Sequence, residues 1–90
     1  MLIALIARDK PGALQTRKEN RDDHLQYIAE TGAVFQAGPL LDEAGEMCGS
    51  LVILEVEDMA AAQAWADGDP YARAGLFQSV ELSAWKKVIG

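Results

Sequence analysis

The chain has few of the residues from which disulfide frameworks and zinc sites are built. Its 90 residues include one cysteine, Cys48, and one histidine, His24. A single cysteine excludes an intrachain disulfide, and these two residues alone exclude a zinc site with several histidine and cysteine ligands. His24 could still bind a metal together with carboxylates, but no cluster of residues has the spacing of metal ligands. We therefore expect neither a metal nor a resident cofactor.

Basic residues are also scarce, since 8 Lys and Arg stand against 14 Asp and Glu, giving a formal net charge of -6. Nucleic acids and anionic lipids both bind basic surfaces, so neither partner is expected. The longest N-terminal apolar run, Leu2 to Ala7, is too short to span a bilayer and has no basic residue before it. Without a signal peptide, a cytoplasmic location is the expectation.

Half of the residues are hydrophobic, which is typical of a globular chain, and the length predicts one domain over 1–90. The apolar run 2–7 predicts a strand because a Pro-Gly breaker closes it, and helical periodicity predicts a helix over 13–31. The order is β-α-β-β-α-β, which predicts a ferredoxin-like α+β fold with a four-stranded antiparallel sheet and helices on one face. The other expected elements are strands over 33–40, 48–57 and 77–88, a turn over 42–46, a helix over 59–66 and a helical turn after 69–70.

The first strand is apolar on both of its faces, which predicts that both faces are covered. Two helices cover only one face of a four-stranded sheet, and no chain is left over for the other. We therefore expect a homodimer formed through the helix-free face of the sheet.

The first helix places charged residues beside its apolar stripe of Leu14, Leu25 and Ile28. At 100° per residue, Arg17, Arg21 and His24 flank or interrupt that stripe instead of opposing it. One interpretation is that the arginine stems cover the edge of the core while His24 caps or packs. The other is a cationic pocket wall containing one group that exchanges protons near neutral pH.

Asp69 precedes a proline, which is the pattern of a helix N-cap. Its alternative role is to orient the His24 ring and stabilise the imidazolium, but 45 residues separate the two and the sequence alone does not bring them together. Ser50 shares a strand face with apolar residues, at the sheet rim or in a pocket. Gly38 ends a strand or admits a ligand close to the backbone. Tyr71 is the aromatic residue that we most expect to face a pocket.

Five short motifs in a fixed order resemble the YciI-like family, from the first strand to Trp85. The resemblance implies a fold of the dimeric α/β-barrel group, related to muconolactone isomerase. It also implies a proposed active site centred on a His-Asp pair, which falls on His24 and Asp69, with Ser50 lining the same pocket. The motifs are Arg21-x-x-His24-Leu25, Ala37-Gly38-Pro39-Leu40, Gly49-Ser50-Leu51, Asp69-Pro70-Tyr71 and Ala74-Gly75-Leu76.

Two functions follow as hypotheses. The first is a small cofactorless enzyme that abstracts a proton from a small anionic or hydroxylated cyclic compound, followed by elimination or isomerisation. In it His24 is the general base, Asp69 orients it, and Arg17 or Arg21 holds negative charge, with Ser50, Gly38 and Tyr71 lining the substrate pocket. The alternative is a non-catalytic subunit that only binds a small ligand in the same pocket.

Overall fold

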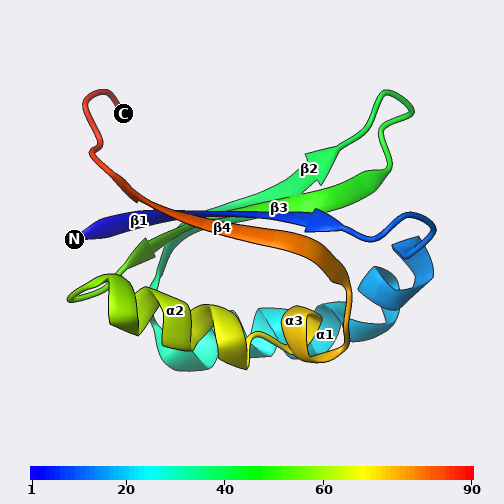
Figure 1. The fold of residues 1–90 in the computed structure, drawn as a ribbon, viewed down its shortest axis with the longest axis horizontal. Coiled ribbons are helices and arrows are strands. Elements are labelled where there is room, and N and C mark those ends of the chain that lie inside the picture. Colours follow the sequence, from blue (N-terminus) through cyan, green and yellow to red (C-terminus); the bar gives the residue numbers. More distant parts are fainter.

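The computed structural model describes residues 1–90 as a four-stranded antiparallel sheet with the helices on one face (Figure 1). The strand order β2-β3-β1-β4 is that of a split βαβ arrangement, so the predicted ferredoxin-like α+β fold is confirmed. None of the helices is both long and apolar enough to cross a membrane. The elements are β1 (Leu2–Asp9), α1 (Leu14–Thr31), β2 (Val34–Leu41), β3 (Met47–Glu55), α2 (Met59–Gly68), α3 (Pro70–Arg73) and β4 (Phe77–Trp85).

Two strand ends differ from the expectation. The second strand was predicted to stop at its Gly-Pro step, but β2 continues through Gly38 and Pro39, and Pro39 pairs with Ser50 of β3. Proline is tolerated there because β2 is an edge strand, so its missing N–H interrupts no central ladder. The last strand ends at Trp85 and not near Val88, and the residues beyond it lie outside the sheet.

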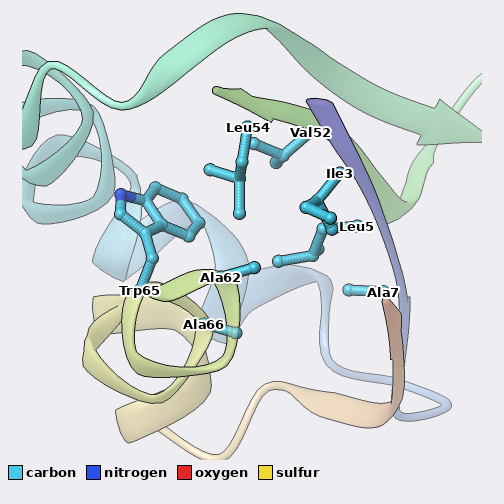
Figure 2. Packing of buried hydrophobic residues seen from close by; sticks show 8 residues of the cluster. All are labelled: Ile3, Leu5, Ala7, Val52, Leu54, Ala62, Trp65 and Ala66. Atoms are coloured by element: carbon cyan, nitrogen blue, oxygen red, sulfur yellow. The ribbon is translucent and has the colours of Figure 1, made fainter. Parts of the chain in front are cut away.

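The hydrophobic core lies between the sheet and α2 (Figure 2). Alternation along β1 turns every second residue toward the helices, as the period of a strand requires. Trp65 of α2 packs over the same layer. The cluster consists of Ile3, Leu5, Ala7, Val52, Leu54, Ala62, Trp65 and Ala66.

The α1 helix turns polar side chains toward the interior. Arg17 is 2% exposed and His24 is 7% exposed, whereas Leu25 is 49% exposed. The predicted stripe was therefore wrong at Leu25, and the interpretation of the arginine as a stem over the core edge was wrong for Arg17. The reason is that polar partners on other elements determine which side of α1 faces the interior. A pattern of hydrophobic residues along the helix contains no information about such partners.

Side-chain hydrogen bonds fasten the end of α1 to α2. The hydroxyl of Tyr27 donates to the carbonyl of Trp65 at 2.8 Å, and the indole N–H of Trp65 donates to Thr31 Oγ1 at 2.9 Å. These bonds hold the two helices side by side on the sheet. They therefore fix the position of α1, which carries Arg17, Arg21 and His24.

The helix-free face of the sheet is apolar in its centre and partly polar along β4. Register places Ala4 across from Ile53 and Ile6 across from Leu51 on this face, but Ile6 is paired on its other side with Glu81 of β4. The expected apolar face is thus narrower than the sheet, since β4 contributes polar residues to it. Dimerisation through this face stays a prediction.

Candidate functional site

A cavity of about 190 Å³ lies between α1 and the β2–β3 pair. An engineered apolar cavity of about 150 Å³ holds benzene, so this volume suits a single ring. Six of the residues singled out in the sequence line it, and Asp69 lies behind His24. The lining comprises Arg17, Arg21, His24, Leu25 and Ile28 from α1, Ala37, Gly38, Pro39, Met47, Ser50 and Val52 from the strands, and Tyr71 from α3.

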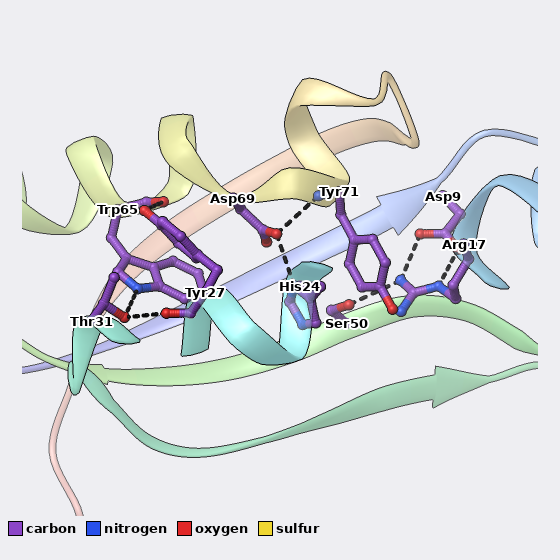
Figure 3. A network of polar contacts seen from close by, with 9 residues as sticks. All are labelled: Asp9, Arg17, His24, Tyr27, Thr31, Ser50, Trp65, Asp69 and Tyr71. Atoms are coloured by element: carbon purple, nitrogen blue, oxygen red, sulfur yellow. Dashed lines mark hydrogen bonds and ion pairs between the residues drawn. The ribbon is translucent and has the colours of Figure 1, made fainter. Parts of the chain in front are cut away.

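His24 and Asp69 form a buried hydrogen-bonded pair (Figure 3). The Nδ1 atom of His24 lies 2.8 Å from Oδ1 of Asp69, and the Asp69 side chain also accepts the backbone N–H of Tyr71 at 3.0 Å. The two roles considered for Asp69, N-cap of α3 and partner of His24, are therefore filled by one oxygen. Because a carboxylate only accepts hydrogen bonds, Nδ1 donates to Asp69, and in the neutral ring the free lone pair is then on Nε2.

Tyr71 lies between His24 and Arg17 (Figure 3). Its ring stacks on the imidazole with centroids 3.9 Å apart and an interplanar angle of 15°, and Cζ of Arg17 lies 4.6 Å from the Tyr71 centroid. Burial raises the pKa of the Tyr71 phenol, although the charges of Arg17 and Arg21 act in the opposite direction. Tyr71 thus restricts the His24 ring on one side and remains uncharged at neutral pH.

Arg17 belongs to a buried ion pair that sequence reasoning did not find. Its Nε lies 2.7 Å from Oδ2 of Asp9, its Nη2 lies 2.8 Å from Oδ1 of Asp9, and Nη2 also donates to Ser50 Oγ at 2.9 Å. Burial opposes the positive charge, but the hydrogen bonds and the negative charge of Asp9 outweigh it and raise the pKa of Arg17. The only available signal was an acid at the end of the first strand, within reach of a helix that begins five residues later.

Ser50 lies in the pocket and not at the sheet rim. It is 3% exposed and shares the helix-facing side of β3 with Val52. Gly49, the preceding residue, sits so close to β1 that a Cβ atom would collide with the carbonyl oxygen of Ala7. The Gly-Ser step therefore lets β3 approach β1 while Ser50 reaches the guanidinium of Arg17.

Arg21 and Gly38 also line the cavity, as the sequence predicted. Arg21 lines the cavity, is exposed, and makes no ion pair with an acid of the chain. Gly38 contributes backbone only, since it pairs with Leu51 and a Cβ there would point into open space. No acidic residue lines the cavity, and no three residues of the metal-binding types lie together as a ligand set.

Known proteins resemble this chain over nearly its whole length. Residues 1–86 match the YCII-related domain. "Protein YciI" of Escherichia coli O6:H1 is 40% identical over an alignment of 97 positions, and the alignment covers 98% of this chain and 99% of that protein.

Solved structures share the fold. The 5-chloro-2-hydroxyhydroquinone dehydrochlorinase (TftG) from Burkholderia phenoliruptrix AC1100, in complex with 2,5-dihydroxybenzoquinone, superposes with a TM-score of 0.86 and 32% identity, covering 96% of this chain and 94% of that one. An antibiotic biosynthesis monooxygenase matches with a TM-score of 0.61 and 14% identity, covering 99% of this chain and 100% of that one. At that identity the second likeness concerns the fold alone.

Proposed function

The chain belongs to the YCII-related domain family, and from this membership and the site geometry we propose that it is a small enzyme with His24 as its general base. The observation that carries the proposal is the buried hydrogen bond from His24 Nδ1 to Asp69, which leaves Nε2 for the cavity. The substrate is a small hydroxylated or anionic cyclic compound, and the reaction is proton abstraction followed by elimination or isomerisation.

His24, Asp69 and Tyr71 have different roles in the proposed reaction. His24 Nε2 removes a proton from the bound ring, and Asp69 stabilises the imidazolium that forms. In an elimination, the electron pair of the broken C–H or O–H bond expels a leaving group. In an isomerisation, the imidazolium returns the proton to another atom of the ring. Tyr71, stacked on the imidazole, keeps the ring from turning away from Asp69.

The similarity to the dehydrochlorinase supports a small-molecule, enzyme-like role. That protein is named for a chlorinated hydroxyhydroquinone and was crystallised with a dihydroxylated benzoquinone, which are single-ring compounds. The volume of about 190 Å³ between α1 and the strands of this chain suits ligands of the same size. Size and chemistry therefore favour the same substrate class.

The test is turnover of a panel of single-ring hydroquinones, halogenated phenols and lactone acids by the wild type and by His24→Gln. We expect at least one compound to be converted, with loss of roughly a hundredfold or more in kcat for His24→Gln. His24→Gln should keep the circular dichroism spectrum of the wild type. Binding of panel members without conversion of any would contradict the proposal and favour the non-catalytic ligand-binding subunit.

We also propose that two copies associate through the helix-free face. Leu51 is 39% exposed and Trp85 is 40% exposed, and the register places both on that face. Burial of these side chains against a second copy removes apolar surface from water. The pocket lies on the opposite side of the sheet, so both can be occupied together.

A further inference from the structure

We infer that the cavity takes its ligand as an oxyanion, the phenolate or enolate of a single hydroxylated ring, bound by the Ser50 hydroxyl and the Arg21 guanidinium. The inference rests on the proposed function because it concerns the same cavity, and it names the ionisation state of the substrate and the groups that hold it. Three observations carry it: the hydrogen-bond direction at Ser50, the lack of an acidic partner for Arg21, and the sign of the charges around the cavity.

The direction of the hydrogen bond at Ser50 makes this residue a donor to the ligand. A guanidinium only donates, so Ser50 Oγ accepts from Arg17 Nη2 at 2.9 Å. The hydroxyl proton of Ser50 is then directed elsewhere, and the Ser50 hydroxyl makes no other hydrogen bond within the chain while Ser50 lines the cavity. A hydroxyl that accepts from a cation is also a stronger donor, because linked hydrogen bonds polarise one another.

Arg17 acts behind Ser50 as a positioning residue. Two of its donors are held by Asp9 at 2.7 and 2.8 Å, and the side chains of the pair are 3% and 5% exposed. The negative charge of Asp9 therefore compensates the positive charge of Arg17. The hydrogen bond from Arg17 Nη2 to Ser50 Oγ then fixes the position of the Ser50 hydroxyl. Arg17 shapes the site through Ser50 and not as the free charge for the ligand.

Arg21 supplies the uncompensated charge. It lies four residues after Arg17 on α1, so both project toward the same side of the helix. It forms no ion pair, and it is exposed at the cavity. A solvent-exposed guanidinium that lines a cavity suits an anion that enters from water and becomes partly enclosed.

The residues that line the cavity include two arginines and no carboxylate. The chain as a whole carries a net charge of -6, yet the permanently charged residues that line the cavity are Arg17 and Arg21, and no lining residue is acidic. Tyr71 adds no negative charge at neutral pH because burial raises the pKa of its phenol. The cavity lining is thus positively charged although the protein as a whole is negatively charged. This difference favours an anionic ligand over a neutral one.

The experiment uses 4-nitrophenol, whose phenolate absorbs visible light, and nitrobenzene as an uncharged ring of similar shape. Binding to the intact wild-type protein should lower the apparent pKa of 4-nitrophenol, and the phenolate should bind at least tenfold more tightly than nitrobenzene. Arg21→Gln and Ser50→Ala should each reduce phenolate affinity about tenfold while leaving nitrobenzene affinity unchanged. Arg21→Lys should restore most of the loss, and Arg73→Gln, an arginine outside the cavity, should have no effect.

A double-mutant cycle tests Arg17 as a positioning residue. Arg17→Lys should lower the ratio of phenolate to nitrobenzene affinity in the wild-type background and should not lower it further in Ser50→Ala. A purely structural role would weaken both ligands equally and leave the ratio unchanged.

Failure of this inference differs from failure of the proposed function. If the phenol binds with its aqueous pKa, if neither ligand binds, or if Arg21→Gln leaves phenolate affinity unchanged, the oxyanion site is overturned. His24-dependent turnover would still stand. If phenolate binding depends on Arg21 and Ser50 but no compound is converted, the oxyanion site stands and the enzyme proposal fails.

Discussion

His24 on α1 and Asp69 at the start of α3, 45 residues apart in the chain, are joined by a hydrogen bond of 2.8 Å between Nδ1 and Oδ1. The same Asp69 oxygen caps α3 by accepting the N–H of Tyr71. A single side chain therefore caps the start of one helix and orients the proton-exchanging group of another. Loss of the cap and loss of the orientation can be separated by substitution.

Asp69→Asn should keep the fold but disturb His24. Asparagine is a competent N-cap, whereas its amide can offer either an acceptor or a donor to Nδ1. The neutral imidazole should then no longer be confined to the Nδ1–H tautomer, and kcat should fall roughly a hundredfold or more. Imidazole ¹⁵N chemical shifts report the tautomer directly, since the chain has one histidine. Identical ¹⁵N shifts in wild type and variant would show that Asp69 does not select the tautomer.

Asp69→Ala should be less stable than Asp69→Asn by about 1 kcal/mol, because alanine cannot cap. Asp58 offers a matched control, since its side chain accepts the N–H of Ala61 at the start of α2, away from the cavity. Asp58→Ala should lose a similar amount of stability in urea unfolding without any loss of ligand binding. Equal stability of Asp69→Asn and Asp69→Ala would contradict the capping role.

Asp9→Ala should destabilise the protein by about 3–5 kcal/mol, because it leaves the buried guanidinium of Arg17 without its partner. Asp23→Ala, which removes an exposed carboxylate from α1, should change stability by less than about 0.5 kcal/mol. Urea midpoints of the two variants give the comparison. A loss for Asp9→Ala as small as that for Asp23→Ala would mean that the buried pair does not stabilise the fold.

Stability should fall as the pH rises above about 10, the ordinary pKa of tyrosine. Burial raises the pKa values of Tyr71 and Tyr27, so the folded state holds these protons more tightly than the unfolded state. The stabilising effect is complete below the unfolded pKa and is lost as the pH rises through the folded values. Tyr71→Phe should therefore show a shallower alkaline loss of stability than the wild type, measured by urea unfolding between about pH 9 and 11, about one unit either side of the reference pKa. If Tyr71→Phe lost stability as steeply as the wild type, the titration of Tyr71 would not be the cause of the alkaline loss.

The chain should be a dimer in solution at micromolar concentration, as judged by multi-angle light scattering. Leu51→Lys places a charge in the apolar centre of the helix-free face, where Leu51 pairs with Ile6, and should shift the protein to a monomer. Gln15→Lys, which also replaces a neutral residue with lysine but at an exposed position on α1, is the charge-matched control and should leave the dimer intact. A wild-type monomer would contradict association through this face.

The sequence by itself determined the order of elements and most of their ends. The apolar run of β1, the cap at Asp58 and the cap at Asp69 depend on residues within a few positions of one another, so local patterns predict them. The same holds for Gly32, whose φ of 63° closes α1 in the left-handed region open to glycine. The candidate site residues were also named from the sequence, through motifs and the resemblance.

Only the tertiary structure decided how those residues meet. Burial of Arg17 depends on Asp9 of β1 and Ser50 of β3, because a charge enters the interior only where partners from other elements replace water. For the same reason the helical stripe misplaced Leu25, and the choice between Arg17 and Arg21 as the free cation stayed open in the sequence. The path of β2 through Pro39 likewise depends on its place at the sheet edge, where no neighbouring strand requires the missing N–H.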